Sequence, residues 1–159
     1  MTRENISSYT MQISQANASQ LTCIAYELWQ TFMAEAMSAY ESGDLPGFSQ
    51  QLRKVQRVNQ EIISMMNHEN ACAQDVMAIH FFINTRLVKS MLKQQPVDLD
   101  RVCEMVKKLQ ASFIELSKAD QDAPLMQNTQ RVYAGLTYGK DSLNESADPL
   151  GQAGRGFLV

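Results

Sequence analysis

The segment Met77–Leu92, with the sequence MAIHFFINTRLVKSML, decides how this chain folds. Read at helical spacing, the segment and the residues just before it carry two apolar stripes. The first stripe consists of Cys72, Val76, Ile79, Ile83 and Leu87. The second lies about one residue away around the helix and consists of Met77, Phe81, Val88 and Leu92. One stripe is enough for a helix to join a core. Two stripes therefore predict either a central helix or a helix that reserves one face for a partner.

Three further stretches show the same helical spacing and have recognisable starts. The first begins near Asn17, where Asn17 and Gln20 form the pattern of a capping box. Gly43-Asp44 is expected to end that stretch and to cap the next, which begins near Leu45. The last follows the break at Pro96, with Asp98 as its expected N-cap. Its expected core heptad is Leu99, Val102, Val106, Leu109, Phe113 and Leu116. Because the connections are short, neighbouring helices are expected to run antiparallel. The chain therefore predicts an all-α fold, an antiparallel up-down four-helix bundle.

Outside the bundle the sequence changes character. Five of the seven glycines stand at or after Gly135, which is typical of a flexible or extended tail. Before that tail, Pro124 can start a short additional helix. We therefore divide the chain into an N-terminal arm (1–16), a four-helix bundle (17–121), a short extra helix (122–136) and a flexible tail (137–159).

Composition excludes several classes of protein. The chain has 159 residues, 45% of them apolar, which suits one globular domain with a real core. A formal charge of −3 without a Lys/Arg-rich block predicts no nucleic-acid partner. No stretch approaches about 18 consecutive apolar residues, so we expect no membrane span, and the opening MTRENISSYT lacks the apolar region of a secretory signal. Cys23, Cys72 and Cys103 are distant in sequence and are expected to be small buried hydrophobes. They favour a reducing, cytoplasmic location.

The two histidines, His68 and His80, are the natural candidates for a metal site. A di-iron bundle needs Glu-x-x-His pairs, but a methionine stands three residues before each histidine. A local site from His68, Glu69 and Cys72 is conceivable, although their turn-like context favours a solvated helix cap. Neither a Gly-x-Ser-x-Gly elbow nor a phosphate-binding loop is present in the sequence. We therefore expect neither a metal nor a cofactor, and a protein that is not an enzyme.

The first expected helix also carries more apolar surface than a single core stripe requires. Its core stripe is Leu21, Ala25, Leu28, Phe32 and Ala36, and beside it stand Tyr26, Trp29, Met33, Met37 and Tyr40. Aromatic and methionine side chains suit a surface that accepts another helix, so both helices predict a groove for a helical peptide. Three other uses stay open. The extra helix or the tail covers this surface, the arm covers it with Tyr9, Met11 and Ile13, or two copies of the chain form a homodimer.

Four motifs, one on each expected helix, resemble those of the flagellin-specific export chaperones, the FliS family. The family motif Leu-Tyr-x-Tyr-Ile-x-x-Arg-Leu corresponds to Ile79–Leu87, where His80 replaces the first tyrosine. The opening Ala-Ser-Pro-x-x-Leu corresponds to Ala16–Leu21, with Ala18 in place of the proline and Tyr26 following. The two remaining motifs are represented by Val55, Gln56, Val58 and Glu61, and by Leu109 and Phe113. The resemblance covers about residues 9–118.

This resemblance implies a cytoplasmic chaperone that binds the disordered C-terminal segment of flagellin in hydrophobic grooves, prevents premature polymerisation and supports type III flagellar export. The resemblance also implies the flagellar export apparatus as a further partner of this chain. We expect the groove surface to consist of Tyr26, Trp29, Met33, Met37, Phe81, Val88 and Leu92. Gln56 and Arg86 match family positions and either anchor the partner or satisfy a polar group at the bundle edge. The alternative is a self-associating or adaptor bundle with a different helical peptide partner.

Overall fold

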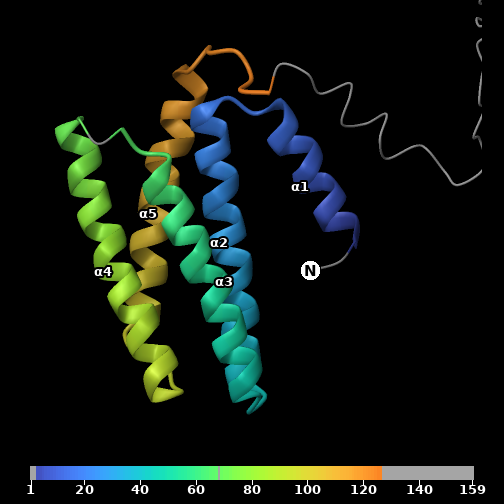
Figure 1. Ribbon diagram of the computed structural model, residues 1–159, viewed down its shortest axis with the longest axis vertical. Helices are drawn as coiled ribbons and strands as arrows, with labels where there is room; N and C mark the ends of the chain where they lie inside the picture. Colours follow the sequence, from blue (N-terminus) through green and yellow to red (C-terminus); the bar gives the residue numbers. More distant parts are fainter. Residues whose placement is uncertain (1–2, 68, 127–159) are drawn as a thin grey trace, which may run out of the picture. The chain divides into compact units, whose positions relative to one another are not determined.

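The computed structural model describes residues 3–67 and 69–126 of the chain. Its helices are α1 (Arg3–Gln15), α2 (Ala18–Glu41), α3 (Leu45–Ser64), α4 (Ala71–Lys93) and α5 (Leu99–Ala119), and the described residues contain no strand. Helices α2 to α5 run alternately in opposite directions (Figure 1). Each packs against the next, and α5 returns to pack against α2. The predicted all-α, antiparallel up-down four-helix bundle is confirmed.

Local capping signals place the helix boundaries where the sequence predicts them. At the start of α2, Asn17 Oδ1 accepts from the Gln20 N–H at 2.9 Å, and Gln20 Oε1 accepts from the Asn17 N–H at 3.1 Å. This is the predicted capping box. At the far end of α2, Gly43 adopts a φ of +78°, a left-handed conformation that glycine enters without a steric penalty. Asp44 then caps α3 by accepting from the Gly47 N–H at 2.9 Å.

The core differs from the predicted one on α2. The buried face of this helix runs through Ala25, Tyr26, Trp29, Met33 and Ala36, whereas Leu21, Leu28 and Phe32 are only half-buried. Helix α2 packs against α3 and α5 and makes the most extensive contacts of the four bundle helices. Turning the bulkier aromatic and methionine side chains inward removes more apolar area from water. The other helices complete the core with Phe48, Leu52, Val55, Ile62, Ile83, Leu87, Leu99, Val102 and Val106.

The segments flanking the bundle also differ from expectation. The predicted arm is helical over Arg3–Gln15, and this helix, α1, lies beside α2 (Figure 1). Residues 121–126 are irregular, so the expected extra helix does not begin at Pro124. The rest of the predicted helix 122–136 and the predicted tail 137–159 lie outside the described residues. None of the described helices is both long and apolar enough to cross a membrane.

Candidate functional site

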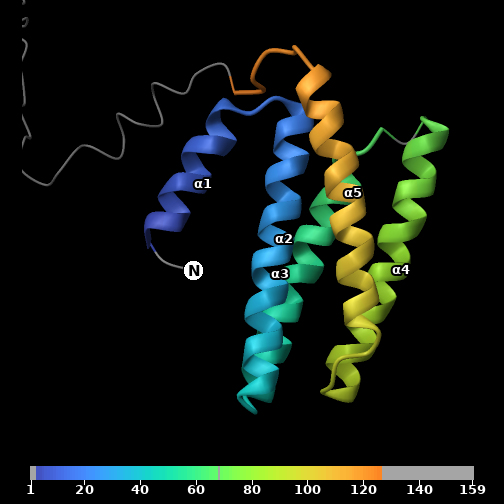
Figure 2. The same cartoon turned by 180° about the vertical axis from the view of Figure 1, so that it is seen from behind.

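Helices α4 and α5 diverge away from the turn that joins them (Figure 2), and they touch each other far less extensively than α2 and α3 do. An apolar groove runs between them. Three adjoining hollows form it, with volumes of about 430, 200 and 360 Å³. The first and second hollows share Leu109 and Ser112, and the second and third share Ile79 and Met105. The three hollows therefore form one continuous feature, which we name the α4–α5 groove.

The groove has the dimensions of a helical ligand. On α5 its lining runs from Arg101 to Leu116, which at 1.5 Å per residue is roughly 22 Å, or four helical turns. The facing wall on α4 is formed by Cys72, Ala73, Val76, Ala78, Ile79 and Phe82. Leu116, which the heptad pattern of α5 assigned to the core, is 60% exposed in this groove. A partner that covers such an exposed apolar side chain removes its surface from water, which favours binding.

Methionine side chains give the groove an adaptable surface. Met65 and Met66, from the connection before α4, line its first hollow, and Met105 on α5 lines the second and third. Thioether side chains are unbranched and flexible, so they conform to irregular apolar partners. Arg101 and Lys108 also line the groove and bring positive charge to its α5 side. The arrangement suits the burial of an amphipathic helix.

His80 belongs to a buried polar chain and not to a metal site. The Tyr26 hydroxyl lies 2.9 Å from His80 Nε2, His80 Nδ1 lies 2.8 Å from Asn59 Oδ1, and Asn59 Nδ2 donates to the His80 carbonyl at 3.1 Å. An amide oxygen only accepts, so Nδ1 carries the proton and Nε2 accepts from the tyrosine hydroxyl. Burial lowers the pKa of His80 to about 4 and raises the pKa of Tyr26, so both groups are neutral near pH 7.

A metal site in the described part of the chain would need several His, Cys, Asp or Glu side chains close together. Within 3–67 and 69–126, no group of three or more His, Cys, Asp and Glu side chains could hold a metal ion. Cys72, expected to be a small buried hydrophobe, is instead exposed and lines the groove. The lining of the groove therefore offers mainly apolar contact area.

Three residues predicted to lie on the partner-binding surface are in the core. Tyr26 and Trp29 are 0% exposed and Met33 is 2% exposed, so their predicted exposure is wrong. The physical reason is that α2 turns its bulky aromatic and methionine side chains toward the core, where they remove more apolar area from water. A direct contact with a partner would require the bundle to open. Met37, from the same stripe, is half-buried and packs against the core.

The predicted partner residues of α4 lie on a different face from the groove. Phe81 is 59% exposed and Leu92 is 79% exposed, while Val88 is half-buried. Phe81 stands two positions from Ile79, about 200° around the helix, so Phe81, Val88 and Leu92 form an outer α4 face away from the groove. The sequence predicts that these three residues contact a partner, which a ligand confined to the groove would not do. Of the residues proposed to cover apolar surface from the arm, Tyr9 and Ile13 are half-buried, whereas Met11 is 51% exposed.

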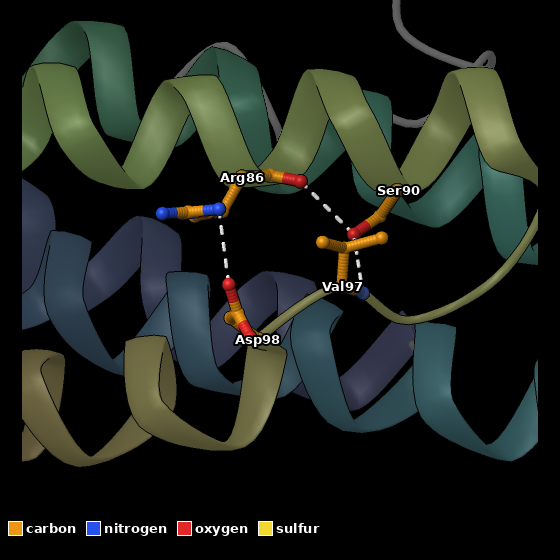
Figure 3. Close-up of polar contacts among 4 residues, drawn as sticks. All are labelled: Arg86, Ser90, Val97 and Asp98. Atoms are coloured by element: carbon orange, nitrogen blue, oxygen red, sulfur yellow. Dashed lines mark hydrogen bonds and ion pairs between the residues drawn. The ribbon is translucent and has the colours of Figure 1, made fainter.

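Gln56 and Arg86 make contacts within the bundle. Gln56 Nε2 donates to Asn84 Oδ1 at 2.9 Å and so joins α3 to α4. Arg86 forms an ion pair with Asp98, with Nη1 and Oδ2 3.0 Å apart (Figure 3). Asp98 precedes α5 as predicted, but its side chain makes no capping bond and faces Arg86 instead. The sequence predicts that these residues either anchor a partner or satisfy a polar group at the bundle edge. The observed contacts are of the second kind.

Sequence reasoning missed most of the groove residues. Val76 and Ile79 on α4 and Leu109 on α5 follow the core stripes, so their spacing predicts burial. The structure places all three along the groove, because α4 and α5 separate there. The available signal was Met105, which widens the apolar stripe of α5 beyond one core face. When two consecutive helices both carry a widened apolar stripe, a groove between them is indicated.

Comparison with known proteins identifies one family. No curated protein matches the chain. The sequence model of one family, described as flagellar protein FliS, matches residues 2–120. The matched region contains all of α1 to α5 and therefore both walls of the groove. The chain belongs to the FliS family of flagellar chaperones.

Proposed function

We propose that this protein is a cytoplasmic chaperone that binds the disordered C-terminal segment of flagellin in the α4–α5 groove. Bound there, the segment is kept from polymerising and stays available for type III flagellar export. Membership of the FliS family supports the flagellar chaperone role. The continuous apolar groove, about four helical turns long, is the observation that carries the choice of binding site.

The physical logic of this proposal is masking by helical packing. A disordered segment that folds on binding must bury enough apolar surface to offset its ordering entropy. Phe113 and Leu116, at the wide end of the groove, supply part of that surface, and the methionines fit it to the ligand. Flagellin subunits join through helical segments, so covering the apolar face of one such segment is sufficient to delay assembly. No catalytic step is needed.

We expect Met105→Asp to weaken binding of a peptide from the cognate flagellin C-terminus by about 10- to 100-fold. Met105 lines two of the three hollows, so an aspartate there would have to lose water when the peptide binds. Isothermal titration calorimetry measures the effect, and urea unfolding of the same variant shows that the bundle is intact. Lack of binding by the unmodified protein would contradict the proposed function.

Phe81→Asp provides the matched control, because Phe81 lies on the exposed outer α4 face away from the groove. We expect this variant to bind the peptide as tightly as the unmodified protein does. If Phe81→Asp weakens binding and Met105→Asp does not, the outer α4 face is the binding site and the groove is not.

Light scattering on the unmodified protein and on Phe81→Asp tests the competing hypothesis of self-association. A dimer that is lost in Phe81→Asp would identify the outer α4 face as a self-association surface.

A further inference from the structure

The side chain of Arg86 contacts one residue in the α4 wall of the groove and one residue just before the α5 wall. On α4, its guanidinium lies over the ring of Phe82, 4.7 Å from the ring centroid, and Phe82 lines the third hollow. Across the gap, the same guanidinium pairs with Asp98 at 3.0 Å. Asp98 stands one helical turn before Arg101, which lines that hollow from the α5 side. Arg86 therefore connects the α4 wall to the start of the α5 wall.

A second contact holds the backbone of the α4–α5 connection at the same place. The Ser90 hydroxyl donates to the Arg86 carbonyl at 2.9 Å and accepts from the Val97 N–H at 2.9 Å (Figure 3). Ser90 is 0% exposed, so these two bonds are shielded from water. Directly after Val97, Asp98 adopts a left-handed φ of 56°, which is uncommon for a residue other than glycine. The chain is thus fixed on both sides of the turn into α5.

We propose that Arg86 and Asp98 are positioning residues that set the spacing of the two groove walls at the third hollow, and thereby the affinity for the bound helical segment. The inference rests on the proposed function, because it concerns the same groove. Helices α4 and α5 touch each other sparingly. Contacts at the turn between them therefore have more influence on their separation than they would in a tightly packed pair.

The exposure of the ion pair distinguishes positioning from general stabilisation. The side chains of Arg86 and Asp98 are 26% and 54% exposed, and ion pairs so accessible to water contribute little to folding stability. Removing the pair should therefore leave the bundle folded. The main consequence would be a change in where Phe82 and the first turn of α5 lie.

We expect Asp98→Asn to weaken binding of the flagellin peptide by about fivefold or more, with little change in the urea midpoint. Arg86→Met should weaken binding similarly, and the double variant should bind no more weakly than Arg86→Met alone, because the two residues act through each other. Glu115→Gln is the matched control. It removes the carboxylate of another ion pair on α5, the 2.7 Å contact with Lys118, and should leave binding unchanged. Unchanged affinity in both Asp98→Asn and Arg86→Met would overturn the inference.

A measurement without peptide keeps this inference separate from the proposed function. Phe82 and Met105 line the same hollow, so we expect the Met105 methyl resonance to respond when the Phe82 ring moves. In protein labelled with ¹³C at the methionine methyl groups, Asp98→Asn should shift that resonance, and Glu115→Gln should not. If the unmodified protein fails to bind the peptide, the proposed function fails while a shifted Met105 signal still supports the positioning role. A Met105 signal that stays in place in Asp98→Asn would contradict that role, whatever the peptide does.

Discussion

Replacing Trp29 with alanine should lower the free energy of unfolding by about 3–5 kcal/mol, the usual cost of truncating a fully buried tryptophan. Trp29 is 0% exposed and is one of the largest side chains in the core. Its truncation removes apolar contacts with the surrounding helices and leaves a cavity that a packed bundle cannot fully close. Urea unfolding followed by circular dichroism measures the loss, since the variant has no tryptophan left to report by fluorescence.

Phe81→Ala is the control for this experiment. Phe81 and Trp29 are both apolar residues that the sequence pattern assigns to a partner-binding surface, but Phe81 is 59% exposed. Its truncation should change the free energy of unfolding by no more than about 0.5 kcal/mol. Equal effects of the two substitutions would show that Trp29 is not part of the core.

The bundle should become less stable between pH 6.5 and about pH 4 because of His80. The pKa of His80 is about 4 in the folded protein and 6.5 in an unfolded chain, and burial is the cause of the difference. Within that window the unfolded chain binds a proton that the folded protein does not, so the free energy of unfolding falls as the pH falls. At about 1.4 kcal/mol per pH unit, the His80 contribution lost across the window is about 3 kcal/mol.

Urea unfolding at several pH values between 7 and 4 measures this dependence. His80→Gln removes the titrating group, so the variant should lose this part of the pH dependence even if it is less stable at pH 7. His68→Gln removes the other histidine of the chain and serves as the comparison variant. Identical pH profiles for His80→Gln and the unmodified protein would assign the effect to other groups, such as carboxylates.

Helix boundaries were predictable because their signals are local. The capping box of Asn17 and Gln20 and the left-handed Gly43 each depend on a few adjacent residues, and the structure shows both. The choice of the buried stripe on α2 was not predictable in the same way. Leu28 and Trp29 are neighbours in sequence, and which of them faces inward depends on the positions of α3 and α5. Periodicity gives the direction of a stripe around a helix but not the partner that covers it.

The same limit explains why the sequence does not indicate the apolar groove between α4 and α5. Val76 and Ile79 follow the spacing of a core stripe, and they would be buried if α5 lay against them. The sequence contains no local sign that the two helices separate. The ion pair between Arg86 and Asp98 was equally hidden, because it forms between residues from two different elements. For His80, spacing alone argued against a metal site, but its partners Tyr26 and Asn59 lie on other helices.

The central claim, that flagellin binds in the α4–α5 groove, is tested most directly by observing the methionine methyl groups while the flagellin peptide is added. The chain has ten methionines, of which Met65, Met66 and Met105 line the groove. Met33, in the core at 2% exposure, is the internal reference. In ¹³C-methyl spectra, the three groove methyl signals should shift or broaden and reach saturation at one peptide per chain, while that of Met33 moves least. A peptide that binds while the signals of Met65, Met66 and Met105 stay in place would contradict the account.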